Sequence, residues 1–468
     1  MHNPEISQTS GFFENPSRRG SIQDAPPLND DIRGSFSFNV NPYFTRRCAM
    51  IKRRALMESI SSNLHSFLKK TGKNLPLTDK KFLRDGLVGL LRARQPIVCQ
   101  MARHLPNQRT KFISRLDRLD QHLVKNSDFD NKVKESLPGL WLPYFQDDTP
   151  IIPDLSDLAK PLAKKMDYLA TVRDGSTGEL VNGYWLLEMY ASLSRKNPVP
   201  VLLQPFSHEE PYSSGQNPIV LKGIHKILEL TDNRGVLVAD RGFDAGVMFE
   251  DWLEHGYRFV ARLVGKRHLL RFSGNAQETD VGQWVPMRAE HLADQVPTPY
   301  RFDKLIKRRG KPAIRITQIG WVKVRLPGRE ETLTLVVSRL AGQDKPMMLF
   351  TNVPVENLKD AKRILRFYIR RWECEEAIRF LKSHVRLEKI RTFRWSAICR
   401  LVLLAVLVML YLGWLLEAHP HICDRLIRLS QPLPDNPDFL LYRLLDGFIE
   451  AIDTCFWLHK DLLRKCLT

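Results

Sequence analysis

The feature that most constrains the fold is an alternation of short apolar segments with amphipathic segments of helix length between residues 146 and 265. Segments rich in large and β-branched side chains predict strands: GYWLLEMYASL, VPVLLQPFS, RGVLVADRGFD and YRFVARLV. Segments with helical periodicity lie between them: IVLKGIHKILEL and AGVMFEDWLEHG. Strands that alternate with helices of this length predict an α/β core with a mixed sheet.

The flanking sequence divides by composition into further regions. The start is rich in Ser, Asn, Pro and Gly, a composition typical of disorder, and short basic helical segments follow it. Those helices suit a DNA-binding domain, although a helical bundle with a basic exterior fits them equally well. The predicted regions are a disordered or loosely ordered tail (1–45), a helical DNA-binding domain (46–145), the core in two parts (146–265 and 346–417), a β-rich insertion (266–345) and a helical C-terminal region (418–468).

The charge of the chain predicts a polyanionic partner. Its 468 residues include 71 Lys and Arg against 52 Asp and Glu, a formal net charge of +19. Such an excess favours nucleic acid before a membrane surface. The seven cysteines have no disulfide-framework spacing, and the N-terminus lacks the apolar core of a signal peptide. We therefore expect a cytoplasmic protein.

One apolar run, Leu401–Leu416, raises the question of a membrane span. It is shorter than the ~20 residues that cross a bilayer, and Arg400 directly precedes it. We therefore predict a buried core helix and no membrane partner. The chain has no G-x-x-x-x-G-K-[ST] loop, so we also predict no nucleotide cofactor.

Three acidic residues are candidates for a metal site. Asp154 follows the apolar run PIIP, and Asp240 follows VLVA, where open α/β sheets place their sites. Asp157 is the alternative to Asp154. Glu375 supplies a third carboxylate, and three converging carboxylates require a cation. Such hard oxygen ligands suit Mg²⁺ or Mn²⁺, and two such ions support in-line phosphoryl transfer.

Glu375 belongs to an unusual helical pattern in FYIRRWECEEAIRFLK. On a regular helix, Tyr368, Arg371, Glu375 and Lys382 project within about 60° of one another. Surface pairing at i,i+4 explains Arg371 with Glu375, but it explains neither Tyr368 nor Lys382. The pattern indicates that these side chains act together.

The spacing Tyr368-x2-Arg371-x3-Glu375-x6-Lys382 resembles the Y-R-E-K signature of DDE transposases from bacterial insertion sequences. VLVADRGFD and IIPDLSDLAKP resemble the second-Asp and first-Asp segments of those enzymes, and the resemblance runs from about residue 145 to 416. It implies a ribonuclease-H-like catalytic core that contains a β-rich insertion. It also implies a catalytic, metal-binding triad of Asp154, Asp240 and Glu375, with Tyr368, Arg371 and Lys382 in contact with DNA.

The resemblance further implies a cut-and-paste transposase of the bacterial cytoplasm, associated with the nucleoid. Such an enzyme binds the terminal inverted repeats of its element, cleaves DNA and transfers strands with two Mg²⁺ or Mn²⁺ ions. Its partners would be double-stranded DNA, both element ends and target, and a second copy of itself in the paired-end complex. Two alternatives remain: a ribonuclease-H-like nuclease without strand transfer, and a domesticated, non-catalytic DNA-binding protein.

Overall fold

The structure, a computed structural model, describes residues 42–105, 110–125, 128–194, 197–273, 283–308, 311–432 and 439–458, with side chains except at 42–54, 304–315 and 454–458. The chain divides into two compact units, Met1–Ala49 and Met50–Thr468. The tail predicted for residues 1–45 lies outside the described residues apart from the first turn of helix α1 (Pro42–Thr71). All later elements belong to the second unit.

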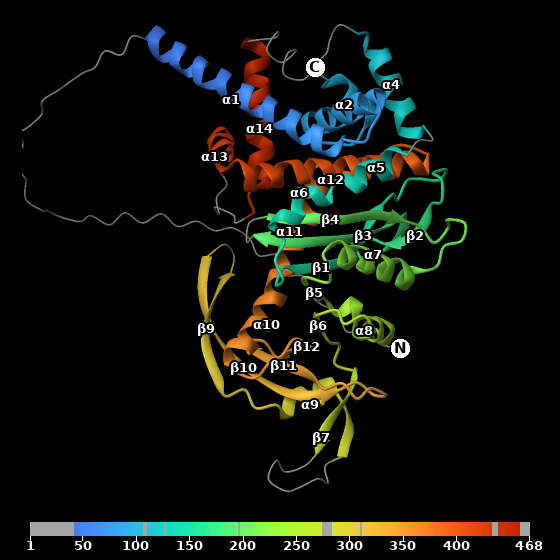
Figure 1. The fold of residues 1–468 in the computed structure, drawn as a ribbon, viewed down its shortest axis with the longest axis vertical. Coiled ribbons are helices and arrows are strands. Elements are labelled where there is room, and N and C mark those ends of the chain that lie inside the picture. Colours follow the sequence, from blue (N-terminus) through green and yellow to red (C-terminus); the bar gives the residue numbers. More distant parts are fainter. Residues whose placement is uncertain are drawn as a thin grey trace, which may run out of the picture. The chain divides into compact units, whose positions relative to one another are not determined.

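In the described part of the chain, twelve strands form one sheet in the order β2-β3-β1-β5-β6-β12-β11-β10-β7-β8, with β4 beside β3 and β9 beside β10 (Figure 1). Strand β3 runs antiparallel to both β1 and β4, whereas β1, β5 and β6 run parallel to one another. The predicted α/β core with a mixed sheet is therefore confirmed. Its strands are β1 (Pro150–Ala159), β2 (Ala170–Arg173), β3 (Leu180–Ser194), β4 (Asn197–Phe206), β5 (Val236–Ala239) and β6 (Phe259–Arg262).

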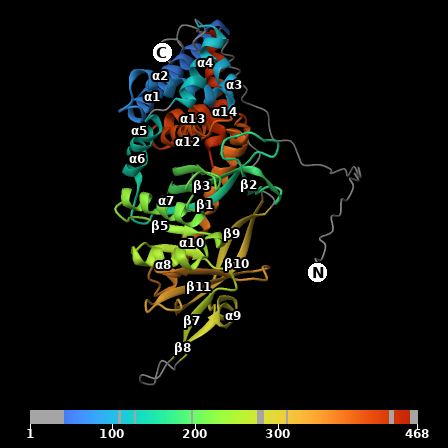
Figure 2. The same cartoon turned by 90° about the vertical axis from the view of Figure 1, so that its right-hand side faces the viewer.

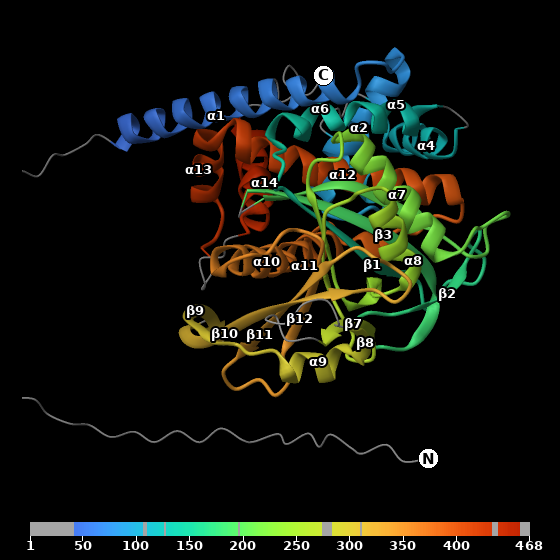
Figure 3. The ribbon, with the colours of Figure 1, turned by 60° about the horizontal axis from the view of Figure 1, so that its bottom comes forward.

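Helices pack on both faces of these strands (Figure 3). Gly223 of helix α7 approaches β3 so closely that a Cβ atom there would lie 2.8 Å from Leu187 and 2.9 Å from Met189. Ser192 leaves the opposite face of β3, because side chains alternate along a strand, and it donates a hydrogen bond to Glu373. The helices on the first face are α7 (Gln216–Leu230) and α8 (Gly246–Glu254); those on the second are α10 (Leu358–Arg370) and α11 (Trp372–Arg379).

The apolar run forms helix α12 (Trp395–Ala418), which packs against β4 and against helices of the N-terminal region (Figure 2). The helix is long and apolar enough to cross a membrane, but 89% of its most apolar window is buried inside the protein. Arg400 is buried as well, and its guanidinium lies 2.8 Å from the carboxylate of Asp130. The predicted core helix is confirmed.

Helices also form both ends of the described chain. Before β1 these are α2 (Leu77–Ala93), α3 (Val98–Arg103), α4 (Phe112–Val124), α5 (Phe129–Ser136), α6 (Pro138–Trp141) and the turn η1 (Leu142–Tyr144). Helices α13 (Pro420–Leu429) and α14 (Leu441–Leu458) follow α12.

The predicted β-rich segment extends the core sheet. Strand β12 (Met347–Thr351) pairs with β6 on one side and with β11 on the other. Strands β10 and β11 are antiparallel. The segment comprises β7 (His268–Ser273), β8 (Gln283–Arg288), α9 (Ala289–Gln295), β9 (Tyr300–Arg308), β10 (Lys311–Arg325) and β11 (Leu333–Leu340).

Two local predictions were wrong. Asp154 does not follow the end of its strand, because β1 continues to Ala159 and pairs along this length with β3. The helix after β12 is not continuous either. The amide of Arg371 donates to the carbonyl of Tyr368, three residues back, which tightens the helix there. A π-helical turn, η3 (Phe380–His384), then follows α11, and a short turn η4 (Leu387–Lys389) precedes α12.

Candidate active site

Asp154 and Asp240 lie on neighbouring parallel strands. Ile151 of β1 is paired with Leu237 of β5, and each aspartate stands three residues further along its chain. Asp240 directly follows β5, as predicted, and caps the short turn η2 (Arg241–Phe243) by accepting a 2.7 Å hydrogen bond from the amide of Gly242. Parallel register thus brings the two carboxylates to one level of the sheet.

The carboxyl group of Asp154 lies in a buried, negatively charged environment. Burial and the charge of Asp240 raise its pKa from 3.8 to about 6. It accepts hydrogen bonds from the amide of Leu155 at 2.8 Å and from the thiol of Cys374 at 3.4 Å. The negative charges of Asp154 and Asp240 therefore repel each other at this site.

Glu375 reaches this region from helix α11. Its neighbour Cys374 contacts Asp154, and Arg371 donates a 2.6 Å hydrogen bond to the Glu375 carboxylate. The charge of Arg371 also lowers the pKa of Asp154. One guanidinium therefore interacts favourably with two of the three predicted carboxylates, Asp154 and Glu375. The Arg371 side chain is 11% exposed and that of Glu375 34%. The buried Nε of Arg371 has no hydrogen-bond partner among the described residues.

Asp157, the alternative first acid, is held in a different set of contacts. It is 3% exposed, and its Oδ1 accepts hydrogen bonds from Lys382 at 2.9 Å and from the amide of Gly175 at 3.0 Å. Lys382 also lies 3.4 Å from Glu388. Although burial lowers the pKa of Lys382, these carboxylates raise it overall. A cation of the protein already neutralises Asp157, whereas Asp154 faces another carboxylate.

The side chains that the sequence pattern places on one face of the helix form a stripe: Tyr368, Arg371, Glu375 and Lys382. This stripe is not a solvent-facing surface. Tyr368 is buried at 2% exposure, and its ring lies 5.8 Å from the guanidinium of Arg371 and 5.9 Å from that of Arg262. Arg371 and Lys382 are ion-paired with Glu375 and Asp157. The stripe therefore faces β1 and the carboxylates, because tertiary packing covers the side of the helix that the sequence pattern marks.

Glu188 is a buried acid at the site that the sequence interpretation missed. It stands opposite Asp154 on β3 and accepts hydrogen bonds from Ser156 and Tyr190. Burial, with a contribution from Asp154, raises its pKa to about 7 despite these bonds. The available signal was a single acid within the apolar strand GYWLLEMYASL. A buried acid is expected to have a specific partner.

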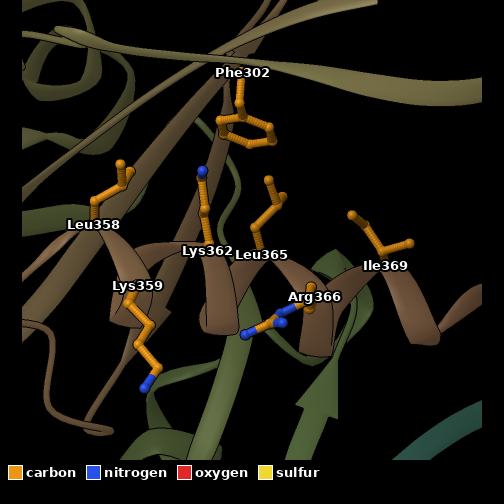
Figure 4. A pocket seen from close by; sticks show the side chains of 7 residues that line it. All are labelled: Phe302, Leu358, Lys359, Lys362, Leu365, Arg366 and Ile369. Atoms are coloured by element: carbon orange, nitrogen blue, oxygen red, sulfur yellow. The ribbon is translucent and has the colours of Figure 1, made fainter. Parts of the chain in front are cut away.

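A basic groove runs beside helix α10, which leads to the site. Its lining combines cations with apolar side chains: Phe302, Leu358, Lys359, Lys362, Leu365, Arg366 and Ile369. Figure 4 shows Lys362 pointing toward the ring of Phe302, 4.6 Å from its centre, while Lys359 and Arg366 point away from it. The groove offers positive charge without an acidic lining residue.

The donor set of the carboxylate cluster fits a hard divalent cation. Asp240 lies close enough to Asp154 for its charge to raise the pKa of Asp154, and a cation between the two carboxylates would relieve this repulsion. Backbone amides hold one oxygen of each carboxylate. The remaining contact of Asp154 is a weak S–H donor, Cys374. Carboxylates of this kind are the ligands that Mg²⁺ and Mn²⁺ prefer.

Comparison with known proteins finds one family match within the chain. Residues 215–411 match the model of a family described as the transposase DDE domain. The match contains Asp240, Glu375 and the other predicted signature residues, whereas Asp154 precedes it. Over residues 215–411 the chain is therefore similar to the transposase DDE domain, and the resemblance to DDE transposases is confirmed over this segment.

Among solved structures, the chain is similar to a piggyBac transposase in a synaptic complex with hairpin DNA. The sequence identity is 11% and the TM-score 0.39, over 89% of this chain and 83% of that one. No curated protein matches the sequence.

Proposed function

We propose that this protein is a cut-and-paste transposase of a bacterial insertion sequence. It binds the terminal inverted repeats of its element, cleaves the DNA there and joins the ends to target DNA. The observation that carries the proposal is the register of Asp154 and Asp240 on parallel strands, with Glu375 on the adjoining helix α11. The match of residues 215–411 to the transposase DDE domain supports it.

The topology supports a ribonuclease-H-like catalytic core. In the order β4-β3-β1-β5-β6, an antiparallel set of three strands adjoins two strands parallel to β1. The carboxylates lie at the junction between the two sets, where antiparallel pairing of the strands gives way to parallel pairing. The segment from β7 to β11 would be the insertion that separates Asp240 from Glu375.

In this proposal Asp154, Asp240 and Glu375 hold Mg²⁺ or Mn²⁺, two ions per site. The bound ions would supply the positive charge that in-line phosphoryl transfer requires at the attacking and leaving oxygens. The protein contributes orientation: backbone amides fix Asp154 and Asp240, and Arg371 fixes Glu375. Asp154 is only partly exposed on a strand that is paired with β3, which limits the access of water to its carboxylate.

DNA contacts would come from the signature cations and the basic groove. The Nε of Arg371 has no hydrogen-bond partner among the described residues, and a guanidinium can bind a phosphate while it keeps one carboxylate. We propose that Tyr368 and Lys382 complete this grip. The groove beside α10 would continue the phosphate path, and the helical region 46–145 would read the element ends. The paired-end complex would contain two copies of the chain in the nucleoid.

The test is a strand-transfer assay. Purified protein is incubated with a labelled duplex of its element end, a supercoiled target and Mg²⁺. We expect cleavage that exposes a 3′-hydroxyl, followed by joined products, and no products after chelation. Cleavage without joining of pre-cut ends would indicate a nuclease instead. Binding without any cleavage would indicate a non-catalytic DNA-binding protein.

A further inference from the structure

A second cluster of potential metal ligands lies on the opposite face of the sheet, between helices α7 and α8. His225 belongs to α7, Asp251 to α8, and His255 is the residue that ends α8. Asp251 and His255 are four residues apart, so they share one face of the helix. One ring nitrogen of each histidine and one carboxylate oxygen of Asp251 all lie within 4.8 Å of one another. Among the described residues, this is the one group of three potential metal-binding side chains whose ligand atoms lie so close together.

Hydrogen bonds orient both imidazoles toward this point. The Nδ1 atom of His225 lies 2.7 Å from the hydroxyl of Tyr257, which directs Nε2 to Asp251 at 3.1 Å. His255 is placed by a 2.9 Å hydrogen bond from its Nδ1 to the backbone carbonyl of Asp251. A histidine that binds a metal commonly has its second nitrogen fixed by such an oxygen partner. The partners therefore preorganise the three side chains before any ligand binds.

Asp251 retains an unused acceptor. Its Oδ1 faces His225, but its Oδ2 is buried without a hydrogen-bond partner among the described residues. A buried carboxylate oxygen without a partner is unfavourable. The oxygen nearest to both histidines is Oδ1, 3.1 Å from His225 and 3.7 Å from His255. A cation bound by this carboxylate and the two imidazoles would compensate its charge.

We infer that His225, Asp251 and His255 form a binding site for a transition-metal ion of the Zn²⁺ class, which fastens α7 to α8. Two imidazole nitrogens and one carboxylate oxygen suit Zn²⁺, with a water as the fourth ligand. This donor set differs from the all-carboxylate cluster at Asp154, because imidazole favours Zn²⁺ and similar ions over Mg²⁺. The site is structural: α8 starts just beyond the turn that Asp240 caps, so the ion would brace the segment after that carboxylate.

The test uses full-length, metal-free protein titrated with Zn²⁺, and with Co²⁺ for its visible spectrum. We expect one equivalent to bind with Co²⁺ absorption typical of nitrogen and oxygen ligands, and the melting temperature to rise. Excess Mg²⁺ should not compete. The variants His225→Ala and His255→Ala should lose this binding, and Tyr257→Phe should weaken it by roughly tenfold or more, since it removes the oxygen partner of His225.

Two control variants show whether the bound Zn²⁺ occupies this cluster. His268→Ala removes an exposed histidine of β7 and should bind Zn²⁺ like the unmodified protein. Asp240→Asn alters the carboxylate cluster and should also retain Zn²⁺ binding, so the inference stands or fails independently of the proposed function. His255 is 47% exposed, so its replacement should leave the fold intact. Equal Zn²⁺ stabilisation in His255→Ala and the unmodified protein, or none in either, would overturn the inference.

Discussion

The ammonium group of Lys382 lies 2.9 Å from the Oδ1 atom of Asp157. This ion pair attaches the π-helical turn after α11 to strand β1, three residues beyond Asp154. It gives the two aspartates of β1 different roles: Asp157 receives a cation of the protein, whereas Asp154 faces Asp240. These contacts favour Asp154 over Asp157 as the first acid of the proposed triad.

This distinction predicts opposite effects for two substitutions. Asp154→Ala should abolish Mg²⁺-dependent cleavage of a labelled element end without lowering the melting temperature. Asp157→Ala should destabilise the protein by about 1–3 kcal/mol, because it leaves Lys382 without its buried partner, yet retain cleavage at low temperature. Urea denaturation and a gel-based cleavage assay measure the two effects. Cleavage by Asp154→Ala but not by Asp157→Ala would reverse the assignment.

The ion pair also allows the two possible roles of Lys382 to be separated. Lys382→Met should lower the free energy of unfolding by about 3 kcal/mol, because Asp157 is left as an uncompensated buried charge. Adding Asp157→Asn should restore most of that stability. If Lys382 also contacts phosphate, the double variant should fold but remain defective in cleavage. Full activity of the double variant would show that Lys382 acts only on the fold.

Arg371 should be sensitive to a change that preserves its charge. Arg371→Lys should reduce cleavage at least about tenfold, because an ammonium cannot orient Glu375 and grip a phosphate in the bidentate way of a guanidinium. Arg379 is the matched control: it pairs with Glu376, and its side chain is 62% exposed. Arg379→Lys should cleave normally. Equal activity of the two variants would remove Arg371 from the proposed site.

The basic groove predicts a salt-dependent effect. Lys359→Ala and Arg366→Ala should each weaken binding to duplex DNA by a similar factor whatever its sequence. Each should also reduce the slope of log affinity against log salt by about 1 if the side chain contacts a phosphate. Fluorescence anisotropy at several salt concentrations measures this slope. An unchanged slope in both variants would place the DNA path elsewhere.

Local sequence patterns predicted much of the core. Strands β3–β6 and helices α7 and α8 are apolar or amphipathic runs whose periodicity is visible without knowledge of their neighbours. The β-rich character of the segment that contains β10 and β11 and the buried helix α12 were also predicted from the sequence. The register of the sheet could not be predicted, since it depends on which strands pair.

The site was less predictable because its contacts join distant parts of the chain. Asp154 was expected after a strand, since polar residues interrupt the apolar pattern of PIIPDLSDLA. Glu188 and Ser156 satisfy each other's polar groups within the sheet, and such cross-strand partners override local propensity. The Lys382–Asp157 pair joins residues 225 positions apart. A helical wheel shows a shared stripe, but it does not show that the stripe is buried against β1.

The carboxylate cluster should cost stability when no cation is bound. The pKa of Asp154 is raised from 3.8 to about 6 by burial and by Asp240. Between about pH 4 and pH 6, the folded protein therefore holds a proton that the unfolded chain has released, and stability falls as the pH rises through this range. Above it the penalty is complete, up to about 3 kcal/mol.

Asp154→Asn removes this titration. In metal-free buffer at pH 7, the variant should unfold at a higher urea concentration than the unmodified protein. The difference should become small at about pH 3, below the ordinary pKa of 3.8, where Asp154 is largely protonated in both states. Glu188 titrates in both proteins, and its raised pKa has only a minor contribution from Asp154, so most of the difference at each pH comes from Asp154. Asp232→Asn, a substitution in the exposed turn after α7, controls for the loss of one acid and should show no such pH dependence.

Mg²⁺ should stabilise the unmodified protein but not Asp154→Asn, because only the carboxylate pair attracts the ion. A variant less stable than the unmodified protein at pH 7 would contradict the repulsion on which the proposed metal site depends.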